Sequence, residues 1–593
     1  MEKFKRFLRR CFPATLWTSK TTQLWVCLIF IILWFDVEWC LATTFTSFSI
    51  VETYINAFLL SVILMLPQML FGSRRVQAFI NLAVAIWLEC NLMYQRTYFM
   101  AIPLSSYAMV GNLSDFTASV ADMLRWSDLG LLGGVIASFI FGFKKSDSAK
   151  PIVWKPYFAT ILIVATLSTA LLYRRGGFVN SWTNLSSANF HGCRVPMYTL
   201  VGSLANDAIN ASTPLSAERK KEVDEWLENH SIEANPDSIG RDNFVLILCE
   251  SLENWVLNLE VQGKEITPNL NRLLADSSTF FAPHIIGQVG AGRSIDGQLL
   301  INAGLLPMNT NVYSMEYPNN AYNTLTKAFA SERATKSYLL TVDKTAVWNQ
   351  EAVANSFGFD TIIARDSWVI DEKIGTRRKL GDRSFARQIV AKMENGEIWN
   401  EDINAFIQIV TYSGHNPFRL PDELDELKLD RNTLPATVAN YLTTAHYTDA
   451  AIGTLVDYLS SRPDYDRTMI VITGDHEGLA SERAELYQAC SFVNPRPEVP
   501  FIVINSPRGG RFDSVAGQID IYPTILDLAG IEGINDWRGM GCSMISPKHP
   551  GVAIGSQGEV FGDTTNVDSS TLNSLTTARN ISDCIITYNL LSK

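Results

Sequence analysis

Acidic, imidazole and hydroxyl side chains follow short apolar runs in the second half of the sequence. Carboxylates and imidazole nitrogens are the ligands that Mn²⁺, Mg²⁺ and Zn²⁺ take in proteins. If the runs are neighbouring strands that end at one edge of a sheet, these side chains converge there and predict a site for one divalent metal ion. The candidates are Glu250 after FVLILC (244–249), His415 after FIQIVT (406–411), and Asp475 and His476 after MIVIT (469–473).

The glycine-rich loop GQVGAGRSIDG (287–297) contains a candidate nucleophile, Ser294. A serine hydroxyl reacts poorly at neutral pH unless a base or a metal lowers its pKa. A divalent ion held by the carboxylates and the imidazole at the strand ends could bind the Ser294 oxygen directly. The glycines would let the backbone approach a substrate closely, and Arg293 could offer a two-pronged hydrogen bond to a phosphate.

The elements that must position these residues alternate between strands and helices. A fourth apolar run, PFIVIN (500–505), follows the first three, and amphipathic patterns such as TPNLNRLLADS (267–277) and TAHYTDAAIGTLVDYLSSR (444–462) separate the runs. Continuous apolar strands separated by helices predict a mainly parallel sheet sandwiched by helices. Ligands of such sheets bind at the carboxyl ends of the strands, which is where the candidate residues lie.

Five apolar segments occupy the first 175 residues, and each is close to the roughly 20 residues that a helix needs to cross a bilayer. Lys and Arg gather in the N-terminal tail, in the turn after the second segment and in the loop after the fourth. With five crossings these regions fall on one side, so the positive-inside rule places everything after residue 175 outside the cytoplasm. The segments are 23–43, 54–71, 77–95, 127–143 and 156–173.

The sequence therefore predicts an α/β protein with a five-helix transmembrane anchor. The net charge of −11 argues against a nucleic-acid partner. The nine cysteines occur singly, without the paired spacing of a zinc site or a disulfide framework. The predicted regions are 1–175 (transmembrane), 176–240 (a connector with a helix), 241–545 (catalytic domain) and 546–593 (a C-terminal segment that packs on the catalytic domain).

Four acidic residues near the motifs are interpreted as structural. Asp520, in QIDIYPT, is expected to organise a strand-to-helix turn. Asp296 is expected to be a hydrogen-bond partner or a cap of the Ser294 loop. Glu253 and Glu477 are expected to face solvent.

Eight motifs, in order over roughly residues 241–545, carry a family resemblance. The region resembles the lipoteichoic acid synthase branch of the alkaline phosphatase and sulfatase superfamily, which includes the periplasmic-glucan phosphoglycerol transferases. The five apolar segments match that architecture too. The motifs are CESLENW, TPNLNRL, GAGRSIDGQLL, WNQEAVANSFGFD, GHNPF, HYTDAAIGTLVDYL, ITGDHEG and QIDIYPTILDLAGI.

The resemblance implies a role for each matching position. Ser294 stands at the nucleophile position, where many relatives have Thr, and Trp348 and His415 match residues that line the phosphate and headgroup pocket. Gln350 stands where relatives often have Arg, and Thr341 or a neighbour stands where they often have His. These departures weaken the case for a glycerol phosphate headgroup. The implied metal ligands are Glu250, Ser294, Asp475 and His476, with manganese expected and magnesium or zinc as alternatives.

The implied reaction has two steps and takes place at a bacterial plasma membrane. Ser294 attacks the phosphorus of a phospholipid donor such as phosphatidylglycerol, diacylglycerol leaves, and a hydroxyl of a glycan or polymer acceptor then displaces the serine. His415 would bind the phosphate or pass a proton to the leaving oxygen. Phosphoethanolamine is an alternative headgroup.

Two other classes of function stay open at this point. One is an ester hydrolase, either a sulfatase or a phosphatase, on the same fold. The sulfatase nucleophile motif, however, has Pro and Arg where this chain has Asp296 and Gln298. The other is a membrane sensor without catalysis, which the intact set of metal-ligand residues argues against.

Overall fold

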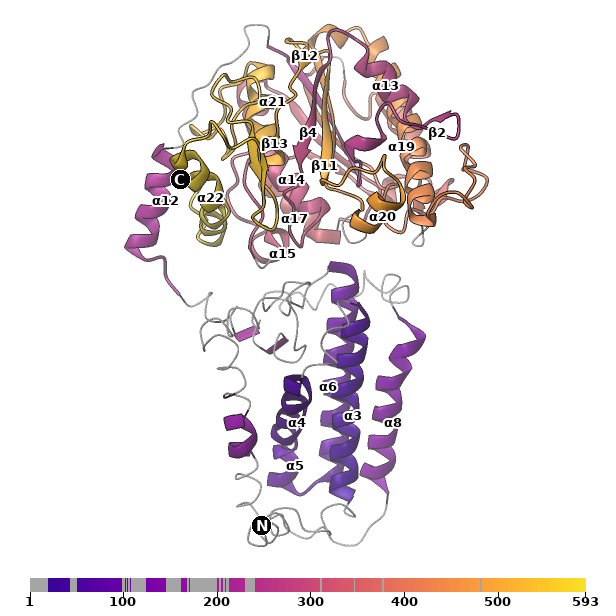
Figure 1. Ribbon diagram of the computed structural model, residues 1–593, viewed down its shortest axis with the longest axis vertical. Helices are drawn as coiled ribbons and strands as arrows, with labels where there is room; N and C mark the ends of the chain where they lie inside the picture. The colour runs from indigo at the N-terminus through magenta and orange to yellow at the C-terminus, as the bar shows by residue number, and fades with distance from the viewer. Residues whose placement is uncertain are drawn as a thin grey trace. The chain divides into compact units, whose positions relative to one another are not determined.

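The chain divides into two compact units, Met1–Pro214 and Leu215–Lys593 (Figure 1). The computed structural model describes residues 20–42, 51–98, 124–144, 213–229, 240–309, 312–345, 347–375, 378–400, 402–479 and 483–592, together with short stretches between 102 and 208.

Three helices of the first unit are long and apolar enough to cross a membrane, namely Thr21–Trp39, Arg74–Tyr94 and Trp126–Phe143. They correspond to the first, third and fourth predicted segments. The second predicted segment is divided where Pro67, which lacks a backbone N–H, starts a short helix, so only a shorter apolar helix is found there. The fifth, 156–173, lies largely outside the described residues, and the count of five is not confirmed. The helices are α3 (Lys20–Ala42), α4 (Val51–Leu64), α5 (Leu66–Phe71), α6 (Arg74–Tyr98) and α8 (Leu129–Phe143).

Polar side chains join the three long helices. The amide nitrogen of Asn81, on α6, donates to the carbonyl oxygen of Leu24 on α3 at 3.1 Å and to the hydroxyl of Ser138 on α8 at 2.9 Å. The hydroxyl of Ser127, just before α8, donates to Glu38 on α3 at 2.9 Å. In apolar surroundings such hydrogen bonds hold helices together where hydrophobic burial cannot.

A nine-stranded sheet forms the centre of the second unit, in the order β12-β4-β11-β10-β1-β9-β5-β6, with β13 beside β4. The neighbours β10, β1, β9, β5 and β6 are all parallel, so the sheet is mainly parallel as predicted. The strands are β1 (Asn243–Cys249), β4 (Phe280–Ile286), β5 (Lys336–Thr341), β6 (Thr361–Ile363), β9 (Ala405–Val410), β10 (Thr468–Gly474), β11 (Glu498–Ile504), β12 (Gly510–Arg511) and β13 (Ala516–Gly517).

One strand runs against the expected direction. The run PFIVIN lies in β11, which is antiparallel to both β10 and β4. Thr473 at the end of β10 pairs with Phe501 near the start of β11, so the chain returns at the same edge instead of crossing over. A parallel neighbour would need a crossover to the opposite edge, which the segment between β10 and β11 does not make.

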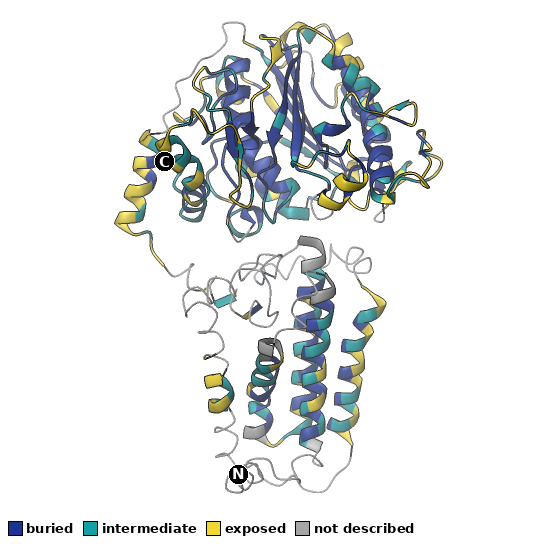
Figure 2. Cartoon of the chain, in the orientation of Figure 1, coloured by how far each residue is buried: buried dark blue, intermediate teal, exposed yellow. Residues whose placement is uncertain are grey.

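Helices cover both faces of the sheet (Figure 1). On β1, Val245 and Ile247 belong to the core beneath α13, α18 and α19, whereas Phe244 packs on Phe329 of α16 with ring centroids 5.0 Å apart. The central strands β1, β10 and β11 are buried along their whole length, whereas the short edge strand β12 is exposed (Figure 2). The helices are α13 (Pro268–Leu274), α18 (Asp382–Glu394) and α19 (Ala436–Ser461) on one face, and α14 (Ser294–Ala303), α16 (Leu325–Arg333), α17 (Gln350–Phe357) and α21 (Ile521–Ala529) on the other.

The two ends of the second unit pack together. The indole N–H of Trp226, on α12 (Ala217–Asn229), donates to the carbonyl oxygen of Ser574 on α22 (Ser569–Thr587) at 3.2 Å. The guanidinium of Arg579, also on α22, donates to the carbonyl oxygens of Gln288, Pro307 and Ser556. The smaller elements are β2 (Glu260–Val261), β3 (Lys264–Glu265), α15 (Tyr313–Glu316), β7 (Lys373–Ile374), β8 (Lys379–Leu380), α20 (Arg483–Ala489), β14 (Val552–Ile554) and β15 (Val560–Gly562).

Candidate active site

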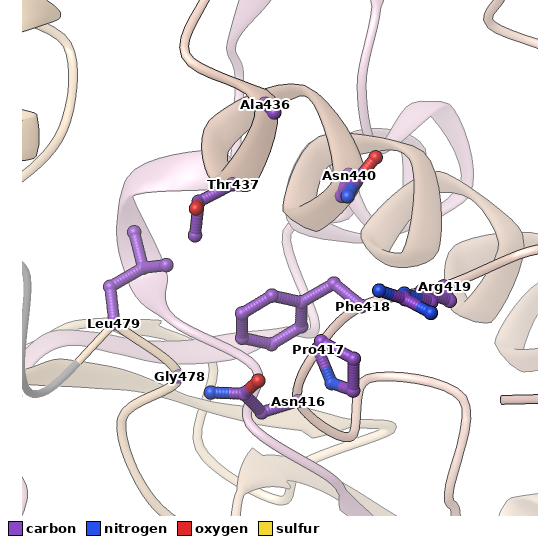
Figure 3. A pocket seen from close by; sticks show the side chains of 9 residues that line it. All are labelled: Asn416, Pro417, Phe418, Arg419, Ala436, Thr437, Asn440, Gly478 and Leu479. Carbon is purple, nitrogen blue, oxygen red and sulfur yellow. The ribbon is translucent and has the colours of Figure 1, made fainter. Parts of the chain in front are cut away.

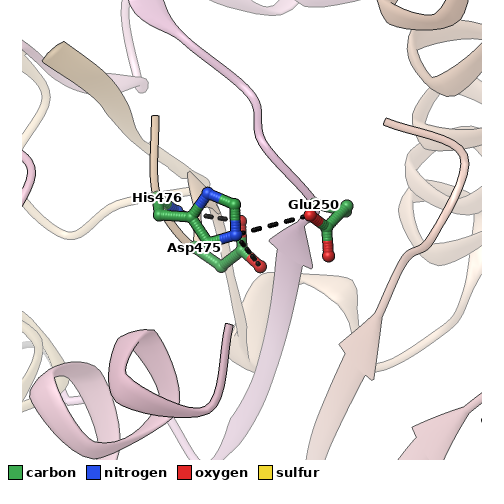
Figure 4. Close-up of side chains that lie close together, drawn as sticks. All are labelled: Glu250, Asp475 and His476. Carbon is green, nitrogen blue, oxygen red and sulfur yellow. Dashed lines mark hydrogen bonds and ion pairs between the residues drawn. The ribbon is translucent and has the colours of Figure 1, made fainter. Parts of the chain in front are cut away.

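Glu250 follows β1 directly and is buried at the carboxyl edge of the sheet (Figure 4). Its backbone N–H donates to the hydroxyl of Thr411, just after the neighbouring β9, at 2.9 Å. One carboxylate oxygen accepts from the Ser251 hydroxyl at 2.9 Å, and the other accepts from the Ser294 hydroxyl at 3.0 Å. Hydrogen bonds therefore orient both carboxylate oxygens of Glu250.

Asp475 and His476 follow β10, the parallel neighbour of β1 on its other side. Asp475 Oδ1 accepts from the backbone N–H groups of Ser251 at 2.7 Å and His476 at 2.8 Å. Asp475 Oδ2 is buried and accepts no hydrogen bond within the part of the chain that the structure describes. A buried carboxylate oxygen without a donor is costly unless a cation or another ligand meets it.

Ser294 is the first residue of α14, and its hydroxyl points at the same place. Its Oγ lies 3.3 Å from His476 Nε2 as well as 3.0 Å from Glu250. The first turn of a helix has unsatisfied N–H groups and a partial positive charge, both of which favour an anion near Ser294. The preceding residue, Arg293, has φ of 49°, a conformation that is uncommon for a residue with a side chain.

The residues fit a divalent cation. One ligand atom each from Glu250, Asp475 and His476 lies within 4.8 Å of the others, and all three residues are buried. His476 Nδ1 lies 2.8 Å from the carbonyl oxygen of Glu477, and a proton on Nδ1 leaves the lone pair of Nε2 directed at the carboxylates. Two carboxylates, an imidazole and a hydroxyl form a donor set suited to Mn²⁺, Mg²⁺ or Zn²⁺.

Strong electrostatic coupling among the three groups shifts their pKa values. Burial would raise the pKa of Glu250, but the hydrogen bond and charge of His476 outweigh it and hold that pKa well below its usual range. Burial, and then the charge of Glu250, raises the pKa of Asp475 to about 7. Burial and Arg293 favour neutral His476, yet the carboxylates raise its pKa to about 9. Without a metal, protons therefore occupy the site to balance the paired carboxylates.

Arg293 is held against the site and does not point freely outward. Its guanidinium donates to a carboxylate oxygen of Glu477 at 2.6 Å and to the backbone carbonyl of Glu477 at 2.7 Å, and it lies 2.9 Å from His476 Nδ1. Glu477 was expected to face solvent, but only 12% of its side chain is exposed because Arg293 covers it. A role for Arg293 in phosphate binding stays a prediction.

His415 and Trp348 do not contact the Ser294 hydroxyl among the hydrogen bonds of the described residues. His415 is exposed after β9, stacks on Tyr412 with centroids 5.2 Å apart, and contributes to the low pKa of Glu250 through its charge. Trp348 is partly exposed in the turn 347–349, with φ of 57°. Their predicted roles in substrate binding stay predictions.

A buried amide cluster occupies the position where relatives often have Arg. The side chains of Gln350 and Gln298 exchange two hydrogen bonds, at 3.0 and 3.1 Å, and Gln408 on β9 donates to Gln298 at 3.2 Å. Thr341, at the position where relatives often have His, is buried and accepts from the backbone N–H of Asp343 at 3.1 Å. Neither Gln350 nor Thr341 brings a cation to the site.

Three of the acidic residues outside the metal-ligand set fix loops around it. Asp296 accepts from the backbone N–H groups of Gly290 and Gly292, both at 2.9 Å, so it caps the Ser294 loop. Asp520 accepts from the N–H of Gly517 at 2.8 Å and orders the turn before α21. The third, Glu253, was expected to face solvent, and that prediction was wrong.

Glu253 is fully buried and holds the loop that follows His476. Its carboxylate accepts from the backbone N–H groups of Gly478 at 2.8 Å and Leu479 at 2.9 Å, and it pairs with Arg483 at 2.8 Å. The sequence contains no local signal for this role, because all three partners lie more than 220 positions along the chain.

Most of the second unit is similar to known proteins. Residues 242–531 match the model of the Sulfatase family. Over 478 residues the chain is 27% identical to the lipoteichoic acid synthase of Staphylococcus aureus (strain USA300), which covers 76% of this chain and 71% of that protein.

Two solved structures share the fold. The lipoteichoic acid synthase LtaP from Listeria monocytogenes has a TM-score of 0.52 at 17% identity, covering 61% of this chain and 98% of that one. The integral membrane lipooligosaccharide phosphoethanolamine transferase A (EptA) from Neisseria meningitidis has a TM-score of 0.50 at 13% identity, covering 88% and 96%. Residues 242–531 thus resemble the Sulfatase family, and over a longer stretch the chain is similar to a lipoteichoic acid synthase.

Proposed function

We propose that this chain is a metal-dependent phosphotransferase of a bacterial plasma membrane, with its catalytic domain outside the cytoplasm. It would move the headgroup of a phospholipid to a hydroxyl of a glycan or polymer through a covalent intermediate on Ser294. The observation that carries the proposal is the placement of the Ser294 hydroxyl, 3.0 Å from Glu250 and 3.3 Å from His476 at the start of a helix.

In the first step, the Ser294 oxygen attacks the phosphorus and gives up the proton that it donates to Glu250. The bond between phosphorus and the diacylglycerol oxygen breaks, and His415 supplies a proton to the leaving oxygen. In the second step, the acceptor hydroxyl attacks the same phosphorus and gives its proton to His415. The bond to Ser294 breaks, and the Ser294 oxygen takes back the proton held by Glu250. A divalent ion, manganese first and magnesium or zinc as alternatives, would be held by Glu250, Ser294, Asp475 and His476 and would stabilise negative charge on the phosphoryl oxygens.

Two observations favour a phosphate ester over a sulfate ester as the substrate. Where the sulfatase motif has Pro and Arg, Asp296 caps the Ser294 loop and Gln298 is hydrogen-bonded to Gln350 and Gln408. The relative from Staphylococcus aureus and LtaP are both named lipoteichoic acid synthases, and EptA is named a lipooligosaccharide phosphoethanolamine transferase. The headgroup is either phosphoglycerol or phosphoethanolamine.

The full chain in lipid nanodiscs tests the proposal. We expect diacylglycerol release from fluorescent phosphatidylglycerol or phosphatidylethanolamine with Mn²⁺ and none with EDTA. Ser294→Ala should lose release by at least about a thousandfold, because the nucleophile is removed. The exposed Ser460→Ala, on α19, is the matched control and should keep it. Cleavage of a sulfate ester with no release from either lipid would reject the transferase.

The covalent intermediate has its own readout. Intact-mass analysis of the chain, quenched with excess lipid and no acceptor, should show one headgroup phosphate added to the wild type and to Ser460→Ala. The Ser294→Ala chain should show none. An unmodified wild-type chain during full turnover would mean that the acceptor attacks the lipid directly.

A further inference from the structure

A buried lysine, Lys379, brings a cation to the edge of the sheet where the candidate active site lies. Lys379 begins β8, and only 7% of its side chain is exposed. Its ammonium forms an ion pair with Asp343, in the segment that follows β5, and lies 4.1 Å from the ring centroid of Tyr412, just after β9. A buried ammonium is costly unless a carboxylate or an aromatic face stabilises it, and Lys379 has both.

Both partners of Lys379 belong to segments that carry the predicted headgroup residues. Asp343 precedes Trp348 in the connection between β5 and α17. The ring of Tyr412 stacks on His415, with centroids 5.2 Å apart. Only β9 lies between β5 and β1 in the sheet, so roughly 10 Å separates the carboxyl ends of these two strands. A lipid whose phosphate is bound at the end of β1 can therefore extend its headgroup toward Asp343 and Tyr412.

The Lys379 ion pair is not part of the cavity of about 220 Å³ that Figure 3 shows. That cavity lies between the segment 416–419, after His415, and the loop that contains Gly478 and Leu479. Neither Lys379 nor its two partners line it. A substitution of Lys379 therefore leaves the residues of the cavity wall unchanged.

The surroundings of the Lys379 ammonium are those that the primary amine of a ligand would need. A carboxylate and the face of an aromatic ring both attract an ammonium group. Phosphoethanolamine ends in a primary ammonium, the same group that Lys379 carries, whereas a glycerol headgroup ends in uncharged hydroxyl groups. Because Lys379 already occupies the carboxylate and the ring face, a second ammonium there meets a like charge. Hydroxyl groups meet no such repulsion, since their oxygens accept hydrogen bonds from an ammonium.

We propose that Lys379 is a specificity-determining residue, which excludes lipid headgroups that end in an amine and restricts the donor to headgroups that end in hydroxyl groups. The inference rests on the proposed phosphotransfer at Ser294 and decides between its two headgroups in favour of the phosphoglycerol type. The cation comes from β8 and not from the position of Gln350, where relatives often have Arg. Specificity of this kind arises from a repulsive element as well as from attractive contacts.

Binding of two soluble headgroups tests the selection without turnover. The probes are glycerol phosphate and phosphoethanolamine, titrated by calorimetry with Mn²⁺ into the full chain in nanodiscs, in which Ser294→Ala prevents turnover. We expect glycerol phosphate to bind this reference chain at least about tenfold more tightly. Adding Lys379→Met removes the ammonium and leaves Asp343 to a ligand. The ratio should then fall by about tenfold, through tighter binding of phosphoethanolamine.

Three further variants keep the test decisive. Lys379→Arg retains a cation and should retain the preference for glycerol phosphate. The double variant Lys379→Met with Asp343→Asn leaves no unpaired charge, so it replaces the single variant if that one fails to fold, and its ratio should fall toward equal binding. Lys392→Met is the matched control, because Lys392 also pairs with a carboxylate, Glu397, and lies 5.6 Å from the Trp368 ring. Lys392 is in the last turn of α18, away from the sheet edge where that helix begins, so its variant should bind both probes as the reference chain does.

Several results would overturn the inference. They are equal binding of the two probes by the reference chain, tighter binding of phosphoethanolamine, no binding of either probe, and a ratio that Lys379→Met leaves unchanged. An equal loss of both probes in Lys379→Met would overturn it too, because the ammonium would then bind the phosphate that the probes share.

Turnover separates this inference from the proposed reaction. Fluorescent phosphatidylglycerol and phosphatidylethanolamine, in equal trace amounts in one phosphatidylcholine nanodisc, should be cleaved by the chain with Ser294 intact in the same order of preference. Lys379→Met should again raise cleavage of phosphatidylethanolamine. A probe preference that depends on Lys379 without release from either lipid would reject the proposed transfer and keep the inference. Release with a preference that Lys379→Met does not change would keep the transfer and overturn the inference.

Discussion

At the scale of single residues, the groups around the Ser294 hydroxyl make it a candidate nucleophile. A carboxylate and an imidazole lie within 3.3 Å, and the N-terminus of α14 adds a favourable field for an anion. The site therefore requires a hydroxyl at this position more than it requires serine itself.

This requirement gives a prediction for Ser294→Thr. Threonine keeps the hydroxyl and adds one methyl group at the first position of the helix, so we expect kcat within about tenfold of the wild type. The measurement is the initial rate of diacylglycerol release at saturating lipid and Mn²⁺. A Thr variant as inactive as Ser294→Ala would show that the added methyl group cannot be placed there.

The metal site should also respond to pH. Metal binding needs Asp475 ionised and His476 deprotonated at Nε2, but burial and Glu250 raise the pKa of Asp475 to about 7, and the carboxylates raise that of His476 to about 9. Protons compete for the same atoms, so affinity for Mn²⁺ should rise as pH increases from about 6 to about 9. Electron paramagnetic resonance of free Mn²⁺ measures this. His284→Gln, outside the site, should keep the slope, and a flat profile would contradict the ligand assignment.

The sequence predicts the convergence of Glu250, Asp475 and His476 because these residues follow their strands directly. The sequence does not predict which charged side chains pack around these ligand residues. Glu477 and Glu253 look like solvated loop residues, and their partners Arg293 and Arg483 are distant in sequence, so only the folded chain pairs them. Local sequence patterns therefore predict which side chains follow a strand. They do not predict ion pairs between residues that are far apart in the sequence.

At the scale of elements, the same distinction explains which features of the fold were predictable. The apolar runs of β1, β9 and β10 indicate buried parallel strands, and the structure has them. β11 has an equally apolar run, yet it is antiparallel to its neighbours. An apolar composition indicates that a strand is buried, but it does not indicate the direction in which the strand runs. In the first unit, Pro67 interrupts an apolar segment that is long enough by composition alone.

The C-terminal helix α22 supports the nucleophile loop from outside the family-matched region. Arg579 donates to the carbonyl oxygens of Gln288, Pro307 and Ser556, at 3.0, 3.2 and 2.6 Å. Arg579→Gln should leave buried carbonyls unsatisfied and lower the local opening free energy of the loop 287–293 by about 1–3 kcal/mol. Amide hydrogen exchange of that peptide should then be faster by roughly 5- to 150-fold.

The exposed Asn573→Ala, on the same helix, is the control and should leave exchange unchanged. Unchanged protection in Arg579→Gln would mean that the loop is held by Asp296 alone.

At the scale of the whole molecule, the distribution of Lys and Arg predicts where the catalytic unit lies. Five crossings place the N-terminus in the cytoplasm and the C-terminus outside, whereas four would place both on one side. A protease added to intact spheroplasts should therefore remove a C-terminal tag and spare an N-terminal tag. Equal protection of both tags would contradict an odd number of crossings, and lysed spheroplasts give the control in which both are cut.

The antiparallel return of β11 has a consequence for which changes of sequence the fold can accommodate. Because β10 ends and β11 begins at one edge, the connection 475–497 starts and finishes there without threading the sheet. It carries two metal-ligand candidates at its first positions and part of the cavity wall directly after them. Insertions or exchanges beyond residue 479 can therefore change the surroundings of the site while β10 and β11 keep their register.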